Sequence, residues 1–137
     1  MFYGCSSLSS APELSSETLA EYCYECMFSG CTSLTTAPTL PATTLAYACY
    51  DSMFYGCTSL TSAPALPAQT LAEGCYGNMF NGCTSLSVSE QPKEGRTEWM
   101  IPSNAITATN WNTGMFYNTG GDFTGDPVPG IKYYIGE

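Results

Sequence analysis

The chain has 137 residues, 44% of them hydrophobic, and carries 3 basic against 12 acidic side chains for a net charge of -9. This length fits one domain. Three cations are too few for binding to nucleic acid or to a peripheral lipid surface. No apolar run approaches the roughly 18 residues that span a bilayer. The absence of histidine excludes Ser–His and Cys–His catalysis and most zinc sites. We therefore expect no enzyme, no cofactor and no bound metal.

Short motifs recur along the first part of the chain with a period of 26 residues. The pair Met-Phe begins at Met1, Met27, Met53 and Met79, and Gly-Cys, Ser-Leu, Ala-Pro and Cys-Tyr follow it in step. Such self-similarity is typical of a tandem array in which each unit packs on the next. We expect residues 1–86 to consist of tandem 26-residue repeats.

One unit is predicted to contain a helix and then a strand. Apolar residues between Leu45 and Cys57 recur at three- and four-residue steps, as on one face of an amphipathic helix. Gly56 suits the end of that helix, where the backbone turns to positive φ. Residues 58–66 have no helical period and run into prolines, which favours a short extended strand.

Stacked units of this kind predict an α/β solenoid of 26-residue strand–turn–helix coils. Leu34 and Leu60 should point inward between the coils. Helices are about 10 Å wide, whereas neighbouring strands lie 4.7–4.9 Å apart, so the helical side should splay outward. A parallel sheet would then line the concave side of a curved molecule.

The repeat pattern breaks after Leu86. A fifth Met-Phe pair at Met115 follows a ten-residue insertion, so we interpret residues 87–137 as a degenerate fifth repeat and an irregular C-terminal cap. The fifth unit covers residues 105–119, and its asparagines and glycine weaken the helix expected there. Asn118 replaces the repeat glycine and should be left-handed, and residues 131–135 read as a closing strand.

The segment from Met53 to Pro67 resembles the BspA-type leucine-rich repeat, whose unit typically reads A-F-x-x-C-x-S-L-x-x-I-x-I-P. The matching positions are Phe54, Cys57, Ser59 and Leu60, with Ala63 at the usual branched position. Pro67 falls one residue late, and the longer period and the Cys-Tyr step depart from the commonest form. The resemblance implies a leucine-rich-repeat solenoid in a bacterial, cell-surface or secreted protein that adheres to a protein or glycan, often host-derived. It supplies no catalytic residues.

The eight cysteines have three interpretations. An even number in an extracellular protein suggests a disulfide framework, and the C-x-x-C at Cys23 and Cys26 suggests a metal site. Seven of the eight fall at repeat positions, which favours buried free thiols stacked in ladders. All three interpretations remain open at this point, with the ladder favoured.

Rows of hydroxyl side chains and the C-terminal aromatic residues are the candidate binding surface. Six candidate ligand-binding residues follow: Thr35, Thr36, Thr61, Ser62, Trp111 and Tyr117. The alternative is that these residues have a structural role. Thr favours strands, and hydroxyl side chains form hydrogen bonds with backbone groups in turns. Regular threonine rows also occur on ice-binding surfaces, but the alternation of Ser with Thr and the expected curvature count against a flat lattice.

Two sets of carboxylates are interpreted as structural. Repeat-related acids on the helical side (Glu21, Glu25, Asp51 and Glu73) could form a glycosidase pair, but their recurrence favours a solvated surface. Asp122 and Asp126 lie among glycines and loosely resemble a calcium loop, without the ligand spacing of an EF-hand.

Two classes of function follow from this sequence. The first is an extracellular recognition module that binds a protein or glycan through the concave face or the C-terminal cap. The second is a structural spacer with no ligand of its own, which burial of the cap aromatics would favour. Because Met1 stands in register with Met27, we expect a fragment of a longer array, or self-association through the N-terminal edge.

Overall fold

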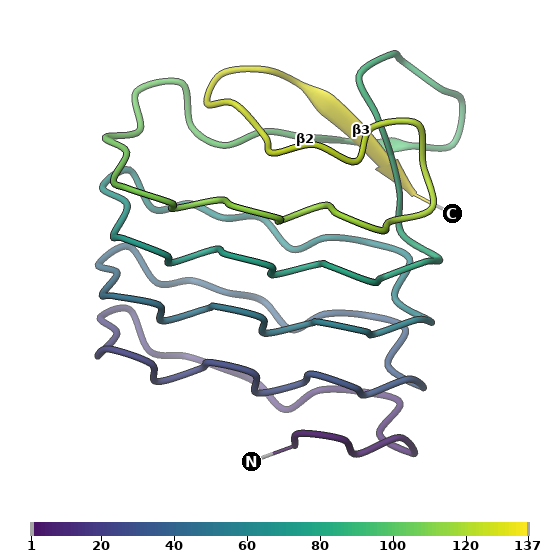
Figure 1. Cartoon of the computed structure of the whole chain (residues 1–137), viewed down its shortest axis with the longest axis horizontal. Helices are drawn as coiled ribbons and strands as arrows, with labels where there is room; N and C mark the ends of the chain where they lie inside the picture. The colour runs from purple at the N-terminus through teal and green to yellow at the C-terminus, as the bar shows by residue number, and fades with distance from the viewer. Residues whose placement is uncertain (1, 137) are drawn as a thin grey trace.

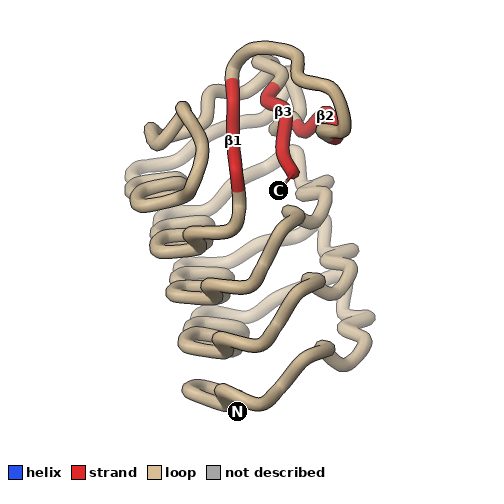
Figure 2. The backbone as a smooth tube through the Cα atoms, turned by 90° about the vertical axis from the view of Figure 1, so that its right-hand side faces the viewer, coloured by secondary structure: helices blue, strands red, loops and turns tan. Residues whose placement is uncertain are grey.

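The computed structural model describes residues 2–136, in which successive repeats stack on one another with a small sheet at the C-terminal end (Figure 1). The strands are β1 (Ser87–Ser89), β2 (Thr97–Trp99) and β3 (Tyr133–Gly136). They pair antiparallel in the order β1-β3-β2. Figure 2 shows the three strands together beyond the last of the stacked repeats.

The expected α/β leucine-rich-repeat solenoid is wrong. Residues 2–136 contain no helix, so the helices predicted over 43–57 and 105–119 are absent. The described part of the chain therefore has no helix that could span a membrane. The three short strands are antiparallel, whereas a leucine-rich repeat needs a parallel sheet on its concave side. The parallel strand pairing between repeats within residues 2–136 is limited to isolated bridges, such as Thr18 with Thr44 and Thr44 with Thr70.

The predicted helix is replaced by a stepped segment, here called the staircase, at residues 20–30, 46–56, 72–82 and 108–118. Within it two kinds of hydrogen bond alternate. The N–H of Ala48 donates to Glu73 in the next repeat at 3.0 Å, and the following N–H, of Cys49, donates to Ala46 within its own turn at 3.2 Å. The staircase segments lie one above another at the front of the stack (Figure 1).

Left-handed backbone at every fourth residue explains why no helix forms. Gly74, Asn78 and Gly82 have φ of 64°, 51° and 81° in one staircase, and Asn110 and Gly114 repeat the pattern in another. An α-helix needs negative φ throughout, so each of these residues would interrupt it. Gly56 has φ of 71° and Asn118 has φ of 59°, which confirms the predicted signs although no helix ends there.

Aromatic ladders form the core. The rings of Phe28 and Phe54 stack with their centroids 5.7 Å apart and their planes 6° apart, and Phe54 stacks on Phe80 at 5.6 Å and 5°. Tyr24, Tyr50 and Tyr76 form a second stack beside them. The rings stay nearly parallel because no helices force one side of the stack apart, so the expected splay is also wrong.

Leucine and cysteine side chains fill the remaining core. Leu34 and Leu60 are fully buried, which confirms that they point inward. The thiols of Cys57 and Cys83 each donate at 3.0 Å to a phenylalanine carbonyl of the repeat before, Phe28 and Phe54 respectively. All eight cysteines are free thiols, five of them buried, which confirms the ladder interpretation over the disulfide framework.

The sheet and the tail close the C-terminal end of the stack. The expected closing strand is present as β3, which lies between β1 and β2 rather than at an edge. Trp99 of β2 is buried, packs edge-on against Phe116 at 5.3 Å, and donates its indole N–H to the carbonyl of Pro64 at 3.0 Å. The Asp126 carboxylate accepts from the Gly114 N–H at 2.9 Å, so the tail covers the last staircase.

Candidate ligand-binding face

Extended segments run along the back of the stack, behind the staircase (Figure 1). Residues 11–15, 37–41 and 63–67 occupy equivalent places in successive repeats and carry the motif Ala-Pro-x-Leu. We call these three segments together the groove face. On it the N–H groups of Thr39, Leu40, Ala65 and Leu66 donate no hydrogen bond within residues 2–136. The groove face therefore has backbone N–H groups without a hydrogen-bond partner among these residues, whereas the N–H groups of staircase residues 48–56 are all hydrogen-bonded.

Proline is the reason that neighbouring extended segments do not form a sheet. Pro12, Pro38 and Pro64 stand at the same position of successive repeats and cannot donate to a ladder. The leucine two positions later turns inward, and Leu40 and Leu66 are buried. Parallel bridges join Ser10 to Thr36 and Thr18 to Thr44 on either side of the first two segments, which have no bridge between them.

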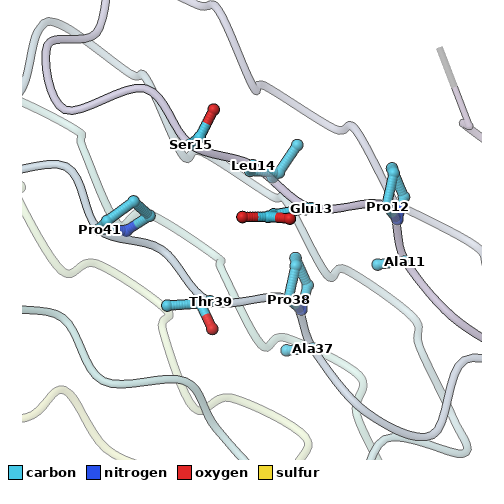
Figure 3. A pocket seen from close by; sticks show the side chains of 9 residues that line it. All are labelled: Ala11, Pro12, Glu13, Leu14, Ser15, Ala37, Pro38, Thr39 and Pro41. Atoms are coloured by element: carbon cyan, nitrogen blue, oxygen red, sulfur yellow. The ribbon is translucent and has the colours of Figure 1, made fainter.

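A groove opens where the first two segments separate. It has a volume of about 590 Å³ and is lined mainly by Ala11, Pro12, Glu13 and the segment 37–41. Figure 3 shows the Glu13 carboxylate lying between the two segments, with the proline rings beside it. The groove offers apolar walls, an anionic group and unpaired backbone, in a volume typical of small-molecule sites.

Similar grooves follow along the same face. One lies between Pro38 and Pro64 and includes Thr39, Ser62 and Ala65 in its lining. The next lies between residues 62–65 and β2, where the buried Trp99 and the strand close most of the space. The face therefore carries a periodic series of sites that ends at the sheet.

The structure brings the four predicted hydroxyl residues to the edge of this face. Thr35, Thr36 and Ser62 are exposed, whereas Thr61 is half-buried and donates its N–H to the Thr35 carbonyl at 3.4 Å. Thr61 and Ser62 also line a shallow depression beside Arg96. The curvature that counted against an ice surface is absent, although the alternation of Ser with Thr still counts against it.

The two predicted aromatic ligand residues lie elsewhere. Trp111 is buried, with its ring edge-on to Tyr76 at 6.2 Å, so it belongs to the core. Tyr117 is 57% exposed but stands on a staircase segment at the front of the stack. The cap aromatics Trp99 and Tyr133 are also buried, so neither ring is exposed to a ligand.

The acidic residues take structural positions. Glu21, Glu25 and Glu73 are exposed, as a solvated surface requires, and Asp51 accepts from the Ser52 hydroxyl at 2.7 Å. Asp122 pairs with Lys93 at 3.2 Å, and hydrogen bonds from Ser89 and Lys93 hold the pKa of its carboxyl below the ordinary value. Within the described residues, no three Cys, Asp or Glu side chains gather as a metal site would need.

Buried thiols are chemically quiet in this structure. Burial raises the pKa of Cys49 to about 11 and that of Cys57 and Cys75 to about 12. Because the thiolate is the reactive form, these cysteines are poor nucleophiles and poor metal ligands near neutral pH.

Sequence reasoning missed the proline–alanine segments as a candidate site, although a signal was present. Pro12, Pro38 and Pro64 recur in register, and a proline at one level of every repeat removes a whole row of donors.

Comparison with known proteins adds no homologue to this picture. No protein-family model, curated protein or solved structure matches the chain. The resemblance to the BspA-type repeat therefore rests on the motif residues alone.

Proposed function

We propose that this chain is a non-enzymatic recognition module that binds a protein or glycan ligand through the groove face. The observation that carries the proposal is the contrast between the two sides of the stack. Alternate N–H groups of the staircase are paired between repeats, whereas the Ala-Pro-x-Leu segments keep open backbone groups beside grooves. The carbonyls of Pro12 and Pro38 accept no backbone hydrogen bond from residues 2–136. Polypeptide amides and sugar hydroxyls are donors that suit these carbonyls and the Glu13 carboxylate.

The setting proposed for this function is the bacterial cell surface or the extracellular space. The BspA-type motif supports it, and a host-derived ligand would be consistent with the motif. A net charge of -9 suits a protein or glycan ligand better than a nucleic acid.

Arrays of glycans and of extracellular-matrix proteins test the proposal. Thr39 and Ala65 are exposed and line the grooves, so the double variant Thr39→Arg/Ala65→Arg should abolish any binding of the parent chain. Thr58→Arg/Thr84→Arg makes the same charge change at exposed turn residues and is the matched control. Binding that both double variants retain would contradict a role for the groove face.

A structural spacer is the second candidate. The burial of Trp99, Trp111 and Tyr133 supports it, whereas the exposure of Tyr117 does not. A chain that binds nothing on either array supports the spacer.

A further inference from the structure

The hydrogen bonds of the staircase give the stack a direction. The N–H of Tyr24 donates to Cys49 at 3.0 Å, and the N–H of Tyr50 donates to Cys75 at the same distance. Every such bond runs from one repeat to the next along the chain. The N–H groups therefore point toward the C-terminal end and the carbonyls toward the N-terminal end.

The carbonyls at the N-terminal end are unpaired. Those of Glu21, Cys23 and Glu25 accept no hydrogen bond from residues 2–136, although their equivalents in the next repeat, such as Cys49, each accept one. Phe2 and Gly4 continue the ladder beside them by donating to Met27 and Ser29. The result is a row of acceptors at alternate positions.

Side chains at this end have partners on only one side. Tyr24 is half-buried, whereas the two tyrosines stacked above it are buried. Leu8 and Leu14 are likewise half-buried, in contrast to Leu34 and Leu60. The N-terminal end thus combines an acceptor row with the half-buried apolar side chains of Leu8, Leu14 and Tyr24.

We propose that this end is a docking surface for one further coil of the same 26-residue repeat. Such a coil brings N–H donors at alternate positions, a Phe ring for the ladder and leucines for Leu8 and Leu14. The N–H groups of such a coil would point toward the C-terminal end, as in the rest of the stack, and would meet the unpaired carbonyls. A second copy of this chain fits less well, because two N-terminal ends would oppose acceptors and the carboxylates of Glu21 and Glu25. A head-to-tail contact would have to displace Asp126, which takes the Gly114 N–H in the middle of the donor row at the C-terminal end.

The test is to place a copy of residues 27–52 directly ahead of residue 1 and to measure amide hydrogen exchange. The copied Ala48, Tyr50 and Ser52 should donate to the carbonyls of Glu21, Cys23 and Glu25 and exchange as slowly as the originals. An extension with the same composition in scrambled order is the control and should exchange rapidly. The protection of the original Tyr50 amide verifies that the stack is folded in both proteins.

Two results would overturn the proposal. One is rapid exchange of the copied residues in a protein whose original stack is protected. The other is a dimer of the unextended chain in sedimentation that Tyr24→Lys abolishes, because a second copy would then be the occupant. Loss of ligand binding would affect neither readout, so this test is independent of the proposed function.

Discussion

The left-handed positions of each staircase require residues that tolerate positive φ. The last staircase meets this requirement with Asn110, Gly114 and Asn118. The staircase at 46–56 instead places Ala48 and Ser52 there, with φ of 50° and 54°. Residues other than Gly and Asn cost roughly 1–2 kcal/mol in this region, so the staircase at 46–56 carries strain that the last one avoids.

Two substitutions in that staircase should change stability in opposite directions. Gly56→Ala should cost about 1–2 kcal/mol, and the cause is backbone strain because the nearest atom to the added carbon would be 4.0 Å away. Ser52→Asn copies the residue at the equivalent position 78 and should gain up to about 1 kcal/mol. Both changes in the free energy of unfolding are measured from the denaturant midpoints of the variants and the parent. A neutral Gly56→Ala would show that the left-handed backbone is not required.

Buried thiols predict a loss of stability at high pH. The folded pKa of Cys57 and Cys75 is about 12, against an ordinary value of 9.0, since burial disfavours the thiolate. Their contribution is complete below pH 9 and disappears as the pH rises toward 12, because the unfolded chain then binds fewer protons than the folded one.

Each such thiol should lower the free energy of unfolding by about 1.4 kcal/mol per pH unit in that interval. Urea melts from pH 8 upward check the slope, with Cys57→Ala as the variant whose slope should be shallower. Equal slopes for the variant and the parent would count against a buried, protonated thiol.

At the scale of the element, the helix was predicted because two periods look alike over a short segment. Buried pairs recur every four residues, as at Cys49-Tyr50 and Met53-Phe54, and this spacing also satisfies the helical steps of three and four. The distinguishing signal is Gly or Asn at every fourth position, as at Gly74 and Asn78. It is clear in two staircases but hidden where Ala and Ser take those places.

The core and part of the site followed from the sequence, while the grooves did not. The inward leucines, the free thiols and the exposure of Thr35, Thr36 and Ser62 were predictable from repeat positions. Trp111 was misplaced because its exposure depends on Tyr76 and on how the insertion rejoins the stack. Grooves arise between repeats, where the missing donors of successive prolines act together, and no single unit contains that information.

At the scale of the whole molecule, Trp99 helps to join the insertion to the stack through its indole N–H and its ring. Trp99→Phe keeps an aromatic ring near Phe116 but leaves the Pro64 carbonyl without its donor. The loss should be about 1 kcal/mol, and Trp99→Ala should cost about 3–5 kcal/mol by leaving a cavity. If Trp99→Phe unfolds at the midpoint of the parent, the indole bond does not secure the sheet.

The central claim is that alternating staircase bonds join the repeats while the groove face stays unpaired. Amide hydrogen exchange resolved by residue tests it most directly. We expect slow exchange across residues 48–57 and 74–83, and fast exchange at Ala63, Ala65 and Leu66. Slow exchange that continues through residues 62–66, as a paired parallel strand would give, would contradict an unpaired groove face and remove the basis of the proposed function.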